Sequence, residues 1–416
     1  MAYVPVAFIL AGMAAYTVLA GADFGAGLWT LLAFGPSGDR VRDQARHAMG
    51  PVWEANHVWL IFVLVVCWTA YPVAFGSITS TLAAPLLIAA IGIIFRGAAY
   101  ALRGVADSSR AAENLLGTSS VLTPFALGTA VGAIAVGRVP VGNAAGNLVT
   151  SWLAPAPVLV GVLAVAFSGY LAAVFLAADS LRYGEAGLAE GFRRRALIAG
   201  VLSGGLALAG LLVMPGSGLN LTHGAALVLV CVSGVAGLAT LALCWLSRFE
   251  LARLTAALAV AAVVVGWAAA QAPRFLPGMT VTQAAAGHST LVALVIAVAC
   301  GSVVLIPSLG LLFTLFLRGR LDTPELHSPG EAPVAPAGVG ATETRVAAVA
   351  TTDGSRGMTR RPGPARGLVA AGVAGLVAGT GLLVFADAPW AHVLGVACLI
   401  LCAAAVFVLS AAPLDS

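Results

Sequence analysis

The sequence predicts an all-α integral membrane protein, and its composition and hydropathy carry this prediction. Of its 416 residues, 60% are hydrophobic and only 9% are charged, and the mean hydropathy is +1.00. A soluble domain carries roughly 25% charged residues, so this chain has too few charges to cover a surface in water. Apolar segments long enough to span a bilayer recur along most of the chain. The lipid bilayer is therefore the expected surrounding, and nucleic acid is not an expected partner.

Nine membrane spans are expected within residues 1–320. Hydropathy places them at residues 4–22, 55–76, 78–100, 119–137, 157–178, 196–214, 223–246, 252–271 and 289–317. Pro215 and the glycines beside it separate the sixth span from the seventh. Pro307 lies inside the ninth span, where we expect a kink.

A weak internal similarity suggests how the spans are grouped. Residues 16–23, followed by an arginine-rich loop, resemble residues 170–179, which are also followed by arginines. The first and fifth spans, which carry these stretches, run in the same direction. The pattern fits a nine-helix core made of two four-helix bundles plus one peripheral helix.

The C-terminal part differs from this core. Residues 321–366 are rich in Pro, Ala, Gly and Thr and contain no aromatic residue. Such a segment cannot bury a core, so we expect a disordered cytoplasmic linker. Residues 367–416 contain two further apolar segments around a tight turn at residues 387–389, which predicts an appended transmembrane hairpin.

The placement of the arginines predicts the orientation. The loop after each odd-numbered span holds two or more arginines, whereas the opposite loops hold only Arg138 and Arg274. Cytoplasmic loops carry the excess of basic residues, so the N-terminus is expected outside and the C-terminus in the cytoplasm. No cleavable signal peptide is expected, because residues 1–20 lack a basic start.

Two carboxylates near one end of neighbouring spans are the main functional candidates. Asp23 ends the first apolar segment, and Glu54 opens the second, where Asn56 and His57 continue the polar side chains into the span. A carboxylate at bilayer depth is costly and usually faces a protein interior or a water path, often to move protons or ions. Proton handling is therefore the favoured interpretation.

Structural interpretations of the same residues stay open. Glu54 could cap its helix or pair with Arg46, and an Asp in a glycine-rich helix end is common. Arg96 and Arg103 lie two turns apart on one helix face. They could extend to lipid headgroups, or pair with Asp23, Glu54 or an acidic group of a partner.

Haem or metal ligation by this chain is not expected. A membrane haem with two histidine ligands needs a second His at the same depth, and no histidine pair has the spacing for this. His57 is therefore expected to be a hydrogen-bonding core residue. The six cysteines lie in apolar segments, as buried cysteines do. No phosphate loop, nucleophile triad or metal-binding motif is present.

The motifs together resemble subunit II of the cytochrome bd-type quinol oxidases. The similar stretches are residues 21–27, 50–60, 95–103, 123–128, 169–172 and 271–273, in the same order. The resemblance implies a heterodimer in the bacterial plasma membrane, in which subunit I carries haem b, haem d and the quinol site. Small single-span accessory subunits are further partners that this resemblance allows.

The resemblance also implies roles for individual residues. Asp23 and Glu54 would line a proton path from the cytoplasm, and Trp59 would border an apolar route for dioxygen. The side chains expected to support the proton path are Asn56, His57, Arg96 and Arg103. Three positions depart from the family pattern: Ala20 replaces an Asp found in many members, Ala55 replaces a Gly, and His57 replaces a Gln or Glu.

The expected function is that of a haem-poor subunit of a terminal oxidase that oxidises quinol and reduces dioxygen to water. The alternative is a secondary transporter that uses intramembrane carboxylates, and a third reading is a passive membrane anchor. An absorption spectrum of the purified complex separates the first two. Replacement of Glu54 separates the oxidase subunit from the anchor.

Overall fold

The computed structural model describes residues 1–34, 38–49, 53–101, 110–213, 221 and 223–317, and five single residues beyond them. The chain divides into two compact units, Met1–Leu326 and His327–Ser416. All elements discussed below belong to the first unit. The predicted linker and most of the predicted hairpin lie outside the described residues.

The described part of the first unit is mostly helical, which confirms the predicted all-α membrane class, while the nine-helix core and the appended hairpin remain predictions. Within the described residues, seven helices are long and apolar enough to cross a membrane, or eight when one bent pair counts as a single span. The elements are α1 (Val4–Leu31), α2 (Gly38–Met49), α3 (Trp53–Ala70), α4 (Pro72–Thr81), α5 (Ala83–Ala101), α6 (Arg110–Ala135), α7 (Pro155–Arg182), α8 (Ala186–Val213), α9 (Gly224–Trp245), α10 (Phe249–Gln271), β1 (Arg274–Leu276), β2 (Met279–Thr280), α11 (Val281–Ala284) and α12 (His288–Leu317).

Helix α1 extends well beyond the predicted end of the first span at residue 22. It continues to Leu31, so Asp23 lies inside the helix and not at its end. The expectation was wrong because Asp and Gly interrupt the hydropathy and have low helix propensity. Tertiary packing outweighs that cost, since Asp23, Gly25 and Gly27 are all buried.

The second and third spans also differ from the prediction. The chain breaks at Tyr71, because Pro72 cannot donate the next hydrogen bond of α3. Helix α4 then starts and meets α5 at a bend of 82°. Hydropathy cannot detect this break, because the segments on both sides are apolar. The hydropathy pattern placed the boundary between the second and third spans between residues 76 and 78.

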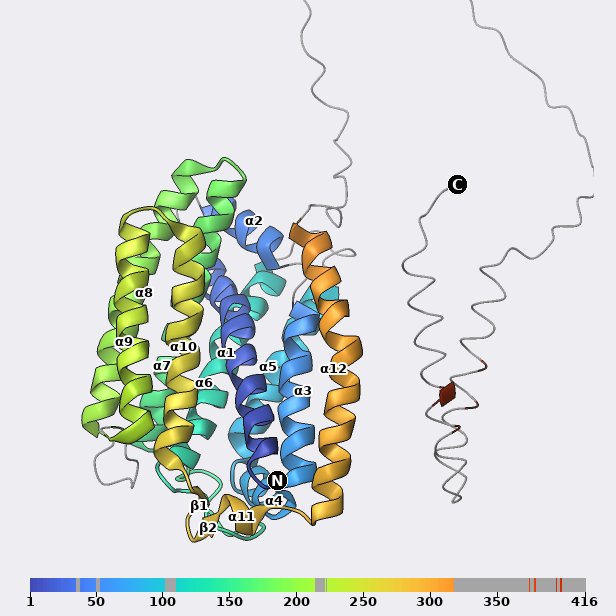
Figure 1. Ribbon diagram of the computed structural model, residues 1–416. Helices are drawn as coiled ribbons and strands as arrows, with labels where there is room; N and C mark the ends of the chain where they lie inside the picture. Colours follow the sequence, from blue (N-terminus) through green and yellow to red (C-terminus); the bar gives the residue numbers. More distant parts are fainter. Residues whose placement is uncertain are drawn as a thin grey trace, which may run out of the picture. The chain divides into compact units, whose positions relative to one another are not determined.

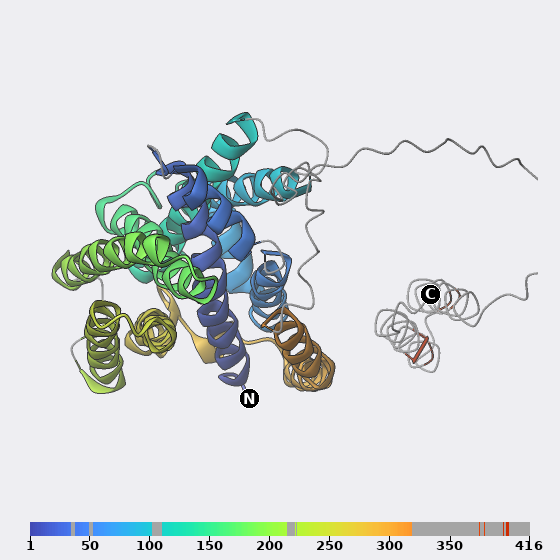
Figure 2. The ribbon, with the colours of Figure 1, turned by 90° about the horizontal axis from the view of Figure 1, so that it is seen from above.

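Helix α1 lies in the middle of the helix bundle of the first unit, as the view from above shows (Figure 2). It packs against α7 and α3, and also against α6 and α10. Helices α8 and α10 pack against α7, and α9 packs against α10 and α8, while α12 lies along α3 at the edge of the bundle (Figure 1). The grouping into two four-helix bundles remains a prediction.

Small residues allow α1 and α7 to approach closely. A Cβ atom on Gly25 would lie 1.8 Å from the Ser168 carbonyl oxygen and 2.7 Å from the Ala172 Cβ. Without a hydrophobic driving force in lipid, such close backbone contact is a main source of helix association. The tight packing predicted for the glycines around Asp23 is therefore confirmed.

A short antiparallel hairpin and α11 close one end of the bundle. Strand β1 pairs with β2, Arg274 lying opposite Thr280. Thr280 and Gln283 form a capping box at the start of α11. The Ala286 N–H then donates to the Ala70 carbonyl at the end of α3, at 2.8 Å. These elements were absent from the sequence-based expectation because they are too short to carry a hydropathy pattern.

Candidate functional site

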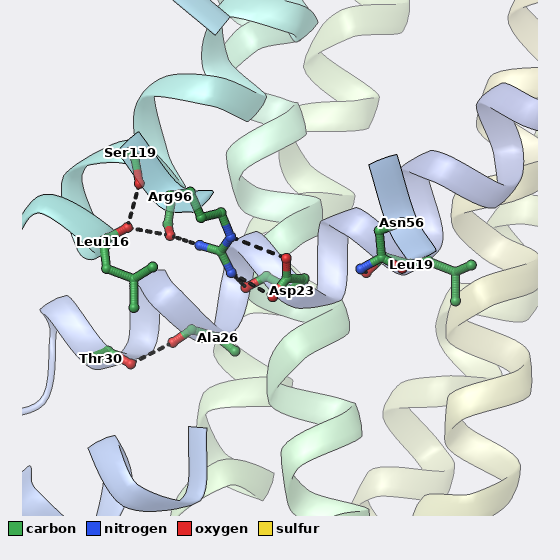
Figure 3. A network of polar contacts seen from close by, with 9 residues as sticks. Leu19, Asp23, Ala26, Thr30, Asn56, Arg96, Leu116 and Ser119 are labelled. Atoms are coloured by element: carbon green, nitrogen blue, oxygen red, sulfur yellow. Dashed lines mark hydrogen bonds and ion pairs between the residues drawn. The ribbon is translucent and has the colours of Figure 1, made fainter. Parts of the chain in front are cut away.

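Asp23 of α1 and Arg96 of α5 form a buried ion pair. Their side chains are 4% and 0% exposed. The Arg96 Nη2 lies 2.5 Å from Asp23 Oδ1, and Nε donates to Oδ2 at 3.2 Å. Nη2 also donates to the Asp23 main-chain carbonyl at 2.9 Å. Figure 3 shows the guanidinium reaching across from α5 to this carboxylate. Of the interpretations open for Arg96, pairing with Asp23 is confirmed, and extension to lipid headgroups was wrong.

The rest of the Arg96 guanidinium is held by α6 and by an aromatic ring. Nη1 donates to the Ser120 hydroxyl oxygen. The Ser120 hydroxyl in turn donates to the Leu116 carbonyl at 2.6 Å. The guanidinium carbon lies 5.1 Å from the centre of the Phe24 ring, within the range of a cation–π contact.

Gly27 makes room for this arrangement. A Cβ atom at position 27 would lie 2.0 Å from the Ser120 hydroxyl oxygen and 3.1 Å from Arg96 Nη1. Any larger residue would push α6 and the arginine away from α1. The glycines that lower helix propensity in α1 are thus the ones that allow the ion pair to form.

Asn56 and His57 of α3 face the same part of α1. Asn56 is fully buried, and its Nδ2 donates to the Leu19 carbonyl at 3.3 Å (Figure 3). Leu19 lies one helical turn before Asp23. The His57 ring lies edge-on to Tyr16, with ring centres 6.2 Å apart, and edge-on to Phe24, at 6.4 Å. The first turns of α3 therefore bring polar side chains to the buried face of α1 that carries Asp23.

The remaining candidates are placed only in part. Glu54 lies in the first turn of α3, three residues before His57. The side chain of Glu54 and all of Arg103 lie outside the described residues. Trp59 packs edge-on against Phe62, with ring centres 6.3 Å apart.

Comparison with known proteins decides the family. The sequence model of the family described as cytochrome bd terminal oxidase subunit II matches residues 1–316. The chain belongs to this subunit II family. The resemblance inferred from the motifs is therefore confirmed.

Individual relatives agree with this assignment. A stretch of 113 residues is 29% identical to the cytochrome bd ubiquinol oxidase subunit 2 of Bacillus subtilis (strain 168). That match covers 26% of this chain and 33% of the relative. The bd oxidase structure from Geobacillus thermodenitrificans has the same fold, with a TM-score of 0.64 at 23% identity. The similarity covers 76% of this chain and 98% of that chain.

The family implies haem in the assembled oxidase, and the surroundings of His57 do not fit a haem. The rings of Tyr16 and Phe24 stand against the imidazole, so a porphyrin plane at this position would have to displace α1 side chains. Among the described residues, no group of three or more His, Cys, Asp or Glu could hold a metal ion.

A second ion pair in this subunit II occupies the region similar in sequence to residues 16–23. Asp179 of α7 lies 2.5 Å from Arg253 Nη2 of α10, and the same nitrogen donates to the Phe175 carbonyl at 2.7 Å. The Arg253 guanidinium also lies over the Phe175 ring, at 5.5 Å. Unlike the Asp23 pair, this pair is partly exposed, with side chains 23% and 17% accessible.

Sequence reasoning missed Ser120, Phe24 and Tyr16 as members of the site. Tyr16 lies two turns before Asp23 on α1, and its buried hydroxyl has no hydrogen-bond partner within the part of the chain that the structure describes. Two signals were available: the seven-residue spacing from Tyr16 to Asp23, which repeats one helix face, and the Ser119–Ser120 pair in an otherwise apolar span. Neither pattern predicts that these groups surround Arg96.

Proposed function

We propose that this chain is the haem-poor subunit of a bd-type terminal oxidase. Membership of the subunit II family over residues 1–316 carries this proposal. The complex would oxidise two quinols and reduce one dioxygen to two waters. Haem b, haem d and the quinol site would belong to subunit I, and small accessory subunits would join at the surface. The transporter alternative is not favoured, because no finding supports it against the family assignment.

We further propose that Glu54 and Asp23 form the proton path of this subunit. The supporting observation is the continuity of polar groups: Glu54 opens α3, Asn56 and His57 follow, and both of these face the part of α1 that holds Asp23. A proton would enter at Glu54 and pass along His57, because an imidazole can accept on one ring nitrogen and release from the other. Arg103 would lie at the entrance.

Arg96 would fix the position of Asp23. A guanidinium that binds both carboxylate oxygens holds the carboxylate in one orientation. If Asp23 accepts a proton, the Ser120 hydroxyl and the Asp23 main-chain carbonyl still hold Arg96 in place. Asp23 can therefore change charge without releasing the arginine from the bundle.

Trp59 is proposed to border the dioxygen route. Its contact with Phe62 supplies an apolar wall on α3 without a charged group. The placement of the arginines supports a multi-pass position in the bacterial plasma membrane, with the N-terminus outside and both the C-terminus and the linker at 321–366 in the cytoplasm.

The deciding experiment is purification of the assembled complex from its own membranes. We expect haem b and haem d bands in the reduced-minus-oxidised spectrum, a co-purifying haem-bearing subunit, and oxygen consumption driven by quinol. A colourless preparation without a partner would overturn the proposal.

A further inference from the structure

A surface hollow lies between the end of α7 and the turn from α9 to α10, at the end of the molecule drawn uppermost in Figure 1. Its volume is about 520 Å³. Leu181 and Arg182 form part of one wall, and residues 247–251 form the other. Nothing in the proposed proton path uses these residues.

The hollow carries one positive charge in excess. Glu250 Oε1 lies 3.6 Å from Arg182 Nη2, and Glu250 Oε2 lies 3.5 Å from Arg253 Nη1. Arg253 also pairs with Asp179, so these two acids and two arginines balance one another. Arg248 is the additional cation, and no acidic group among the residues that the structure describes pairs with it.

The main chain of the turn adds to the positive potential. Arg248 is the N-cap residue of α10, and its side chain makes no capping hydrogen bond. The first N–H groups of this helix are therefore not capped by the side chain of the N-cap residue. The positive end of the α10 dipole lies at the hollow, where Glu250 in the first turn offsets part of its potential. At the end of α9, by contrast, Arg193 already donates to the Trp245 carbonyl.

The walls beside these charges are apolar and exposed. Leu181 and Leu251, which line the hollow, are each 50% exposed. Trp245 and Tyr183 are also exposed, and these residue types are enriched where a membrane meets water. Helix α7 has 28 residues, which corresponds to about 42 Å, more than the ~30 Å hydrocarbon core. Its Arg182 end therefore reaches the headgroup layer.

We propose that this hollow binds one anionic phospholipid. Arg248 and Arg182 bind the phosphate, and the acyl chains lie along Leu181 and Leu251. A zwitterionic lipid would bring its own ammonium group toward Arg248, and the repulsion between these two positive charges disfavours its binding. A free phosphate would leave the apolar walls unused, so the lipid satisfies both parts of the site.

The test uses the protein as purified from its membranes, with whatever subunits accompany it. Lipid is exchanged in nanodiscs of phosphatidylglycerol or phosphatidylcholine, and the lipid retained after transfer to detergent is counted by native mass spectrometry. We expect one retained phosphatidylglycerol per copy of this chain and about tenfold less phosphatidylcholine, the ratio expected for one additional charge-assisted hydrogen bond.

Arg248→Gln should reduce retained phosphatidylglycerol about tenfold. The matched control is Arg194→Gln, which removes an exposed arginine of α8 outside the hollow and should retain the lipid. Equal loss in both variants, or equal retention of the two lipids by the parent, would overturn the proposal. Displacement of the lipid by millimolar inorganic phosphate would indicate a phosphate site instead. If Arg248→Gln does not fold, the amounts of phosphatidylglycerol and phosphatidylcholine retained by the parent protein still test the proposal. Neither the lipid comparison nor the variant comparison depends on oxidase activity.

Discussion

Arg96 and Asp23 are 73 positions apart in the sequence and share three hydrogen bonds in the interior of the helix bundle. The arginine also reaches Ser120, so one side chain connects α5, α1 and α6. A buried charge without its partner is strongly destabilising. The pair therefore has two consequences that can be separated: it stabilises the bundle and it positions a carboxylate at the end of the proposed proton path.

Arg96→Gln should lower the free energy of unfolding by about 3–5 kcal/mol, because it leaves Asp23 as an uncompensated buried charge. Asp23→Asn should act similarly, and the double variant should be less destabilised than the sum of the two. Thermal unfolding of the purified protein measures this. The control is Arg193→Gln, which removes a partly exposed ion pair with Glu190 and should cost about 0–1 kcal/mol. Equal losses in Arg96→Gln and Arg193→Gln would contradict the prediction.

Glu54→Gln should reduce oxygen consumption per haem far more than Glu54→Asp does. The amide keeps the shape of the side chain and cannot exchange a proton, whereas the aspartate keeps the chemistry and shortens the reach. Haem content should remain intact in both variants. If Glu54 only caps α3, assembly should fall in both variants and the surviving complexes should turn over normally. Parental turnover in Glu54→Gln would remove this residue from the proton path.

Gly25→Ala should prevent normal packing of α1 on α7. The added Cβ would lie 1.8 Å from a main-chain carbonyl oxygen, which cannot move aside as a flexible side chain can. Gly204→Ala on α8 is the control, because nothing lies within 4 Å of a Cβ at that position. Size-exclusion chromatography should show loss of the monodisperse peak in the first variant only. A normal peak for Gly25→Ala would mean that the helices can separate without cost.

This chain expressed without subunit I should show no strong haem b signal. A porphyrin plane at His57 would have to displace the side chains of Tyr16 and Phe24, whose rings stand against the imidazole. A reduced-minus-oxidised spectrum of the isolated chain tests this. The idea would be refuted by a haem b band that disappears in His57→Ala.

Deletion of residues 321–416 should leave quinol oxidase activity in an assembled complex. The family match ends at residue 316, so the deleted part lies outside it. Oxygen consumption by the truncated complex is the measurement. Complete loss of activity with normal haem content would assign a catalytic role to the C-terminal part.

Hydropathy was sufficient to locate most membrane helices, because a span must bury its backbone polar groups in a long apolar helix whatever its neighbours are. The predicted starts and ends of the seventh to ninth spans lie within a few residues of α9, α10 and α12. The same hydropathy pattern identified Asp23 and Glu54 as candidate functional residues, since charged residues are rare within membrane spans and stand out in the sequence.

Tertiary packing alone decided which residues surround Asp23 and which arginine pairs with it. Its helix continues past it because Gly25 and Gly27 let α7 and α6 approach, and helix propensity could not reveal that contact. Its partner, Arg96, could not be chosen from the sequence, because which arginine meets Asp23 depends on how α5 packs on α1. The break at Tyr71 and the 82° bend after α4 are further features of three-dimensional packing. Contacts between residues far apart in the chain depend on relative helix rotation and approach, which hydropathy does not encode.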